Sequence, residues 1–201
     1  METIETDKKP GVPPGKTKII NAMRALLEDR GLYAITISDI AVTAGVTEGL
    51  IYKYFKDKRD LLNYVLKEHY EVFLVQIKRD LKGVEGALNK LRKIIWSSIE
   101  RYANHRVFAR IILLEVRNSE AYFKSEAYEL VREFNRIVLD IIEQGIKNKE
   151  IRSGLSAFYI RNAIFGTIEH SCLNRVLFNE TVSTDETADH ITDLIFNGIK
   201  T

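Results

Sequence analysis

The sequence predicts an all-α protein with a small helix-turn-helix unit near its N-terminus and a larger helical body after it. Apolar residues recur at helical spacing through most of the 201 residues. No stretch of useful length alternates apolar and polar residues as a half-buried strand would. The three prolines, Pro10, Pro13 and Pro14, all lie before the first predicted helix, so they interrupt none of the helices that follow.

The composition is that of an ordinary globular protein, with 45% hydrophobic and 29% charged residues. A net charge of +2 excludes a protein coated in positive charge, such as a nonspecific DNA compactor, but permits a local basic patch. The single cysteine, Cys172, cannot form an internal disulfide, which fits a reducing cytoplasm. No apolar stretch reaches the ~18 residues of a membrane span, so we expect a cytoplasmic protein without a membrane partner.

Changes in composition and periodicity divide the chain into three predicted parts. Residues 1–15 are polar and proline-rich and read as a disordered tail. Residues 16–62 form the helix-turn-helix domain, and residues 63–201 form the body. One helix, from Asp57 to about Leu81, belongs to both. The body then continues in five predicted helical segments: 87–103, 107–116, 119–147, 156–177 and 184–199.

Local signals between Thr36 and Phe55 predict two short helices joined by a tight turn. Thr36 followed by Asp39 resembles a capping box at a helix start. Gly45 follows the last apolar position of that helix, where a left-handed residue ends it at little cost. Thr47 can cap the second helix, whose Ile51 is expected to point inward.

The outer side of the second helix carries Thr47, Gly49, Tyr52 and Lys53. A hydroxyl, a phenol, an ammonium and a bare backbone position suit phosphate oxygens and base edges in a DNA major groove. The alternative is an amphipathic hairpin within an all-helical protein, with no nucleic-acid role.

The run AVTAGVTEGLIYKYFKDKRDLL, which begins at Ala41, resembles the DNA-binding signature of the TetR family of bacterial repressors. The resemblance implies a three-helix DNA-binding head on a ligand-binding and dimerisation body, with double-stranded operator DNA as the partner. The residues that we predict to contact DNA are Thr36, Thr47, Glu48, Gly49, Tyr52, Lys53, Tyr54 and Lys58.

Two body stretches, 113–123 and 141–170, resemble the branch of that family that represses fatty-acid degradation genes. The resemblance implies a hydrophobic inducer, a long-chain acyl-CoA, that releases the protein from DNA. The residues that we predict to contact this ligand are Phe108, Ile112, Arg117, Phe134, Ile137, Ile141, Phe165, Ile168 and Glu169. The alternative is a TetR-type repressor of an efflux gene that is induced by cationic aromatic drugs, for which Glu115 and Glu169 would supply the acidic contacts.

The last two predicted helices carry more apolar surface than one small body needs, including Phe158, Phe165 and Leu194. We expect them to form an isologous homodimer interface, because proteins with one recognition helix per chain bind paired half-sites. The remaining alternative is a helical interaction module that does not bind DNA.

The sequence shows no catalytic motif, and we expect neither an enzyme nor a cofactor. A zinc-protease motif, a dinucleotide-binding glycine run after a strand and a phosphate loop are all missing. The four histidines lie far apart and none has metal-ligand spacing, so we expect no metal site.

Overall fold

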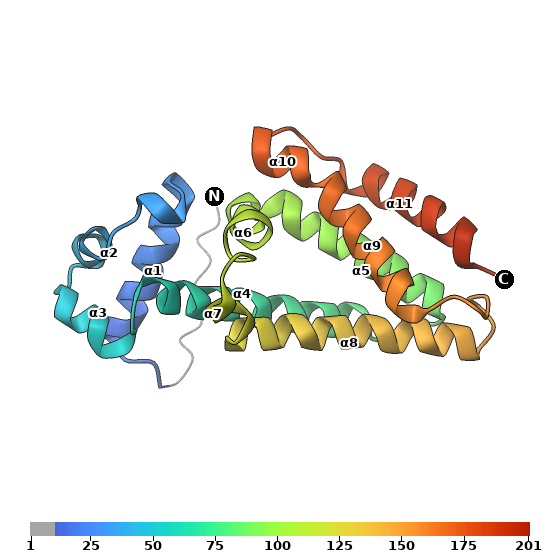
Figure 1. Ribbon diagram of the computed structural model, residues 1–201, viewed down its shortest axis with the longest axis horizontal. Coiled ribbons are helices and arrows are strands. Elements are labelled where there is room, and N and C mark those ends of the chain that lie inside the picture. The colour runs from blue at the N-terminus through green and yellow to red at the C-terminus, as the bar shows by residue number, and fades with distance from the viewer. Residues whose placement is uncertain (1–10) are drawn as a thin grey trace. The chain divides into compact units, whose positions relative to one another are not determined.

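The computed structural model describes residues 11–201, and this part of the chain is built from helices (Figure 1). The predicted all-α fold is confirmed. The α-helices are α1 (Pro14–Asp29), α2 (Ile37–Ala44), α3 (Glu48–Tyr54), α4 (Lys58–Asp80), α5 (Ala87–Asn104), α6 (Arg106–Arg110), α7 (Glu120–Phe123), α8 (Glu126–Lys147), α9 (Ala157–Ser171), α10 (Leu173–Phe178) and α11 (Thr184–Ile199). A 3-10 turn spans Leu32–Ala34 and a π-helical turn spans Ile111–Glu115. The only strand-like pairing within residues 11–201 is a bridge between Ile151 and Lys200.

Two compact units divide the chain between Val65 and Leu66. The sequence predicts this boundary after residue 62, about one helical turn earlier. The helix α1 begins at Pro14, so the last two residues of the predicted tail are helical. Residues 1–10 of that tail lie outside the described residues.

The first unit packs α1, α2, α3 and the start of α4 around one apolar core. Each helix contributes side chains that are fully buried, among them Ile19 and Met23 from α1, Ile40 from α2, Ile51 from α3 and Leu61 from α4. This core holds α3 by one face and leaves the opposite face of the helix free.

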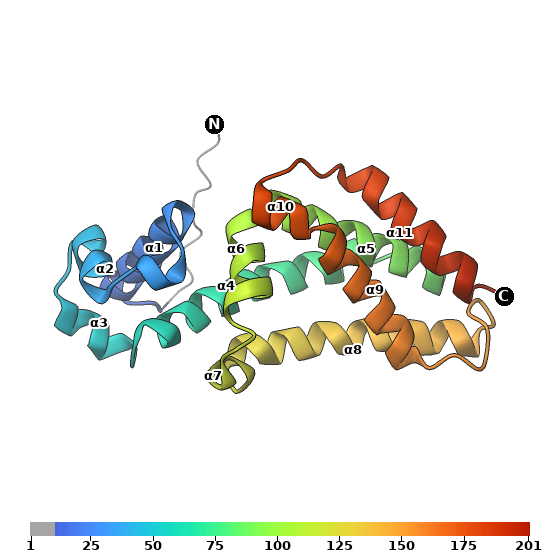
Figure 2. The same ribbon diagram turned by 45° about the horizontal axis from the view of Figure 1, so that its top comes forward.

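The second unit is a helical body with α5 at its centre. Residues Leu91, Ile94, Ile95 and Ile99 of α5 are fully buried against apolar side chains of α8, α9 and α11. In both views, α8 runs beside the part of α4 that belongs to this unit (Figures 1 and 2). Lys78 of α4 accordingly pairs with Glu133 of α8 at 2.6 Å.

Three of the predicted body segments are interrupted in the structure. The segment 119–147 breaks after Phe123, because the Ser125 side chain accepts a hydrogen bond from the Tyr128 amide and caps a new helix, α8. The segment 156–177 divides at Cys172 into α9 and α10. In the segment 107–116 the helix widens at Ile111–Glu115.

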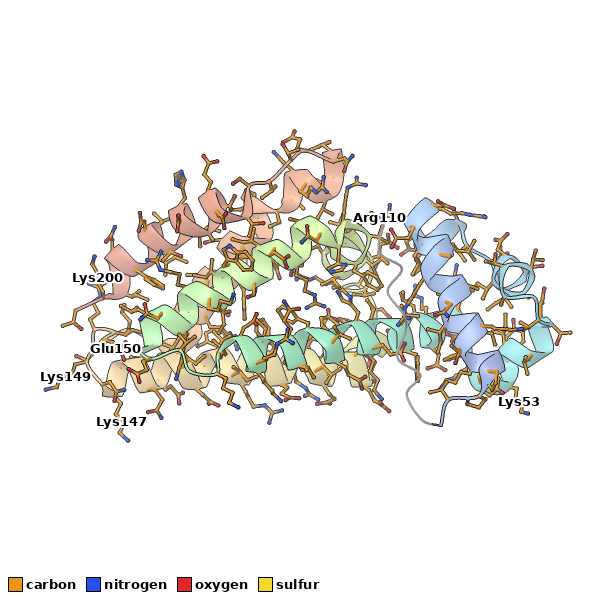
Figure 3. The ribbon with its side chains drawn as sticks, turned by 180° about the vertical axis from the view of Figure 1, so that it is seen from behind. Lys53, Arg110, Lys147, Lys149, Glu150 and Lys200 are labelled. Carbon is orange, nitrogen blue, oxygen red and sulfur yellow. The ribbon has the colours of Figure 1, made fainter. Side chains whose placement is uncertain are left out.

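Glu150 connects the residues that follow α8 to the start of α5. Its carboxylate accepts a hydrogen bond of 2.7 Å from the Ala87 amide and so caps α5. Figure 3 shows Glu150 near the end of α8, in the neighbourhood of Lys147, Lys149 and Lys200. Within residues 11–201, none of the helices combines the length and apolar character that crossing a membrane requires.

Candidate DNA-binding surface and ligand cavity

The turn between α2 and α3 follows the local rules predicted for it. The Thr36 hydroxyl accepts a hydrogen bond from the Asp39 amide, and the Asp39 carboxylate accepts one from the Thr36 amide. Gly45 has a φ of 62° and a ψ of 43°, the left-handed conformation that ends α2. Thr47 then caps α3 by accepting from the Leu50 amide at 3.3 Å. Together these contacts set the direction in which α3 leaves the turn.

The outward side of α3 is accessible over its whole length. Thr47, Glu48 and Gly49 are exposed, as are Tyr52 and Lys53. A methyl group added at Gly49 would meet only the Thr47 hydroxyl, at 3.9 Å, so a ligand could approach the backbone there. The Lys53 ammonium lies 5.9 Å from the Tyr54 ring centre, and Figure 3 shows this lysine on α3. This surface has the donors that a phosphate backbone and base edges require.

The three other predicted DNA contacts are half-buried or already have a partner inside the unit. Tyr54 is half-buried, while Thr36 is exposed but serves as the cap of α2. The half-buried Lys58 donates hydrogen bonds from its ammonium to the carbonyl oxygens of Leu32 and Ile35, at 2.8 and 2.5 Å. Lys58 therefore connects the start of α4 to the 3-10 turn and the residue after it.

A cavity of about 390 Å³ opens in the helical body, within the usual size range of small-molecule sites. Its walls are mostly aromatic and aliphatic, with a few polar groups. The lining residues are Tyr70, Phe73, Leu74, Ser98, Arg101, Tyr102, Ile112, Arg117, Tyr122, Phe123, Tyr128, Leu130, Val131, Phe134, Asn135, Arg161, Asn162, Phe165, Ile168 and Glu169. An apolar cavity with a few polar groups is typical of a binding site for a largely hydrophobic molecule.

Six of the nine predicted ligand residues line this cavity: Ile112, Arg117, Phe134, Phe165, Ile168 and Glu169. The other three are not among its lining residues. Phe108 stacks on the His69 ring with centroids 4.1 Å apart, and Ile141 packs against the body core. Ile137 lies on α8 beyond the stretch that faces the cavity, which ends at Asn135.

Arg117 and Glu169 neutralise each other at the cavity wall. The guanidinium donates two hydrogen bonds to the carboxylate, at 2.9 and 2.5 Å. These hydrogen bonds raise the pKa of the Arg117 guanidinium, so it stays charged. The bidentate geometry is the strongest form of this pair, and it leaves neither charge free in the structure described.

Tyrosine hydroxyls form a second polar group in the cavity. The hydroxyl oxygens of Tyr70 and Tyr122 lie 3.0 Å apart, within hydrogen-bonding distance. Burial raises the pKa of Tyr70 to about 12 and also raises the pKa of Tyr102 and Tyr122. All three are neutral phenols at physiological pH, able to donate as well as accept.

The sequence interpretation misses Arg101 and Ser98 as cavity residues. Both lie on α5, three positions apart, and therefore share one face of the helix. The available signal was that this face is otherwise apolar, which makes a serine and an arginine there unusual.

Two family models match the chain. The model described as "Bacterial regulatory proteins, tetR family" matches residues 19–65, and the model described as "YsiA-like protein, C-terminal region" matches residues 66–198. The chain belongs to the TetR family. The resemblance of the N-terminal motif to TetR-family repressors is thereby confirmed.

The chain is also similar to TetR-family regulators of fatty-acid metabolism. It is 29% identical to the fatty acid metabolism regulator protein of Bacillus subtilis over 186 residues, which is 92% of this chain and 96% of that protein. The crystal structure of FadR from Bacillus subtilis in complex with stearoyl-CoA is 29% identical and has a TM-score of 0.80, over 91% of this chain and 98% of that one.

The structure of the fatty acid degradation regulator FadR from Bacillus halodurans, at 22% identity, has a TM-score of 0.81 over 94% of this chain and 97% of that one. At this identity the likeness shows the fold alone. The relatives named here are regulators, and the family model that matches residues 19–65 describes bacterial regulatory proteins.

Proposed function

We propose that this protein is a transcriptional repressor that binds an inverted-repeat DNA operator as a homodimer and is released by a long-chain acyl-CoA. The observation that carries the proposal is the aromatic-lined cavity of about 390 Å³ in the body of a TetR-family chain. Its similarity to a regulator solved with stearoyl-CoA supports the choice of ligand class.

The exposed side of α3 supports the DNA-binding part of the proposal. Thr47, Tyr52 and Lys53 project from a helix whose other side is held by the buried Ile51. A helix presented in this way can enter the major groove with its polar residues facing the base edges. Lys53 is the exposed cationic residue of α3, so we propose that its ammonium contacts a DNA phosphate.

Exposed apolar side chains on α9 and α11 support the homodimer. Phe158 and Tyr159 of α9 are 51% and 72% exposed, and Leu194 of α11 is 71% exposed. Ile168 and Ile195, also on these helices, are buried in the body core instead. Large apolar side chains left in solvent are typical of an interface with a second protein surface.

The charge of the cavity favours an anionic inducer over a cationic drug. The lining includes three guanidinium groups, of Arg101, Arg117 and Arg161, and one carboxylate, of Glu169. That carboxylate is already paired with Arg117. A cationic aromatic compound would therefore meet an excess of positive charge and no free acidic partner among the lining residues.

The proposal is tested by titrating operator-bound protein with acyl-CoAs of increasing chain length. Burial contributes ~0.8 kcal/mol per methylene, so affinity should rise about fourfold per methylene until the cavity is full. Phe165→Glu should leave operator binding intact and abolish release, because a charged side chain then occupies the apolar wall.

Val75→Glu is the matched control for this substitution, because Val75 lies on the body surface with 69% of it exposed. This variant should respond to acyl-CoA as the wild type does. If no acyl-CoA releases the operator and a cationic aromatic compound does, the proposed inducer class is wrong.

A further inference from the structure

The cavity contains a guanidinium that has no acidic partner. Arg101 donates from Nε to the His69 ring nitrogen Nε2 at 3.0 Å, and its guanidinium lies 4.8 and 4.1 Å from the ring centres of Tyr70 and Phe73. Its Nη2 is buried and has no hydrogen-bond partner. Apart from His69, its charged and titratable neighbours are tyrosines, and within residues 11–201 no carboxylate pairs with it.

A second buried donor without a partner lies beside it. Ser98 lines the same cavity, the residue is 7% exposed, and its Oγ has no hydrogen-bond partner. Ser98 and Arg101 are three residues apart on α5, so both face the cavity from one side of the helix. A buried donor left unsatisfied destabilises the folded state, and a charged one does so more strongly. Two of them together at one cavity wall form a site prepared for an acceptor.

The missing acceptor is best supplied as an anion. A neutral carbonyl could accept one hydrogen bond but would leave the guanidinium charge unbalanced in an apolar surrounding. An inorganic anion would balance the charge but leave the apolar walls, such as Phe134 and Phe165, without contacts. A carboxylate carried on a hydrophobic chain meets both requirements. The carboxylate balances the guanidinium charge and can accept from Nη2 and from a hydroxyl at once, while the chain contacts the apolar walls.

We infer that Arg101 and Ser98 form a carboxylate-binding site inside the cavity, and that the preferred ligand places an anionic carboxylate there with an apolar chain attached. This inference deepens the proposed ligand site and rests on it. The carboxylate has two possible sources: the head group of a free fatty acid, or the distal carboxylate of an acyl-CoA whose chain ends in one.

Binding measurements on the full-length protein test the site directly. Dodecanoate and dodecanol have the same chain and differ in charge, and dodecanedioyl-CoA and dodecanoyl-CoA differ only by the distal carboxylate. A charged hydrogen bond contributes about 10- to 100-fold in affinity. Wild-type protein should therefore prefer the carboxylate member of at least one pair by at least about tenfold. The pair that shows the preference identifies the source.

The variants separate a binding role from a structural one. Arg101→Met should abolish the preference and leave binding of the member that lacks the carboxylate within about twofold of wild type. Ser98→Ala should weaken carboxylate binding by a few fold and leave the ligand-free protein equally or more stable, because a buried unsatisfied hydroxyl is removed. Ser97→Ala is the matched control: its Oγ is also buried and unpartnered, but Ser97 does not line the cavity. It should leave carboxylate affinity unchanged.

The inference is overturned if wild-type protein shows no preference in either pair, or if Arg101→Met keeps the preference. It is also overturned if Ser97→Ala weakens carboxylate binding as much as Ser98→Ala does. Each of these results would leave the proposed function standing, since unmodified acyl-CoA could still bind and release the operator. Failure of every acyl compound to bind would instead refute the proposed ligand class itself.

Discussion

Lys58→Met is expected to destabilise the first compact unit, which is the proposed DNA-binding unit, rather than to act on DNA alone. The wild-type ammonium donates to the carbonyl oxygens of Leu32 and Ile35 at 2.8 and 2.5 Å. Both of those residues are buried, with exposed fractions of 5% and 0%. Methionine keeps most of the apolar stem of the side chain, so the substitution removes the charge and its hydrogen bonds with little change in packing.

The expected loss follows from these two contacts. A hydrogen bond to a charged group contributes ~1.5–3 kcal/mol, so two would contribute about 3–6 kcal/mol if they were additive and fully buried. Because Lys58 is only half-buried, we expect the pair to contribute less than this sum. We expect a loss of about 2–3 kcal/mol, a large part of the ~5–15 kcal/mol that stabilises a typical domain. Amides of α2 and α3 exchange when the first unit opens locally, and Lys58→Met should lower the free energy of that opening by the same amount. Hydrogen exchange at these amides should therefore accelerate about 30- to 150-fold.

Lys53→Met is the matched control for this measurement. Lys53 is exposed on α3, where its ammonium lies 5.9 Å from the Tyr54 ring centre, so its replacement should change stability by less than about 0.5 kcal/mol. It should instead reduce the slope of operator affinity against salt by about one unit, as the loss of one phosphate contact does. If Lys58→Met leaves hydrogen exchange unchanged and reduces the salt slope, then the assignment of a structural role to Lys58 is wrong.

Three further outcomes are expected. Gly145→Ala should destabilise the body by about 1–3 kcal/mol in urea unfolding, because the new methyl group would lie 2.7 Å from the Ala87 Cβ. Adding Ala87→Gly should restore part of the loss. The Thr36 amide and hydroxyl lower the pKa of the Asp39 carboxyl, so its stabilising effect is present above the unfolded pKa of ~3.9 and is lost as pH falls through the lower folded value. Asp39→Asn should therefore unfold more easily than wild type at neutral pH, with the difference shrinking below about pH 4. Leu194→Arg should shift sedimentation at micromolar concentration from dimer to monomer, and an unchanged dimer would place the interface elsewhere.

The sequence predicts the DNA-binding unit closely because its determinants are local. The Thr36–Asp39 capping box, the left-handed Gly45 and the Thr47 cap each involve residues within three or four positions of one another. The role of Lys58 could not be predicted in this way. Its two carbonyl partners are 26 and 23 residues away in the chain, and only the packing of α4 against the 3-10 turn brings them together.

The cavity is predictable in its apolar walls and less so in its polar groups. Phe134 and Phe165 stand out because aromatic residues on amphipathic helices face inward. Arg101 does not stand out as a cavity residue, because arginine is normally exposed and a single charged residue on an apolar face is easily assigned to the surface. Phe108 is aromatic as well, but it stacks on His69. Which aromatic residue faces an open space depends on how the helices meet, and a helical period carries no information on that.

The Arg101 Nη2 that lacks a partner also gives the carboxylate ligand proposed above a source of free energy for changing the protein's state. A ligand shifts an equilibrium only by its difference in affinity for the two states, and allosteric coupling of about 1–3 kcal/mol is typical. Satisfying a buried donor yields free energy of this size. The guanidinium rests on the rings of Tyr70 and Phe73, so an anion that draws it into the cavity acts directly on α4. That same helix begins at Lys58, whose ammonium holds the 3-10 turn of the DNA-binding unit. On this proposal the signal passes from Arg101 to one helix, because α4 carries both the rings that contact Arg101 and the lysine that secures the 3-10 turn.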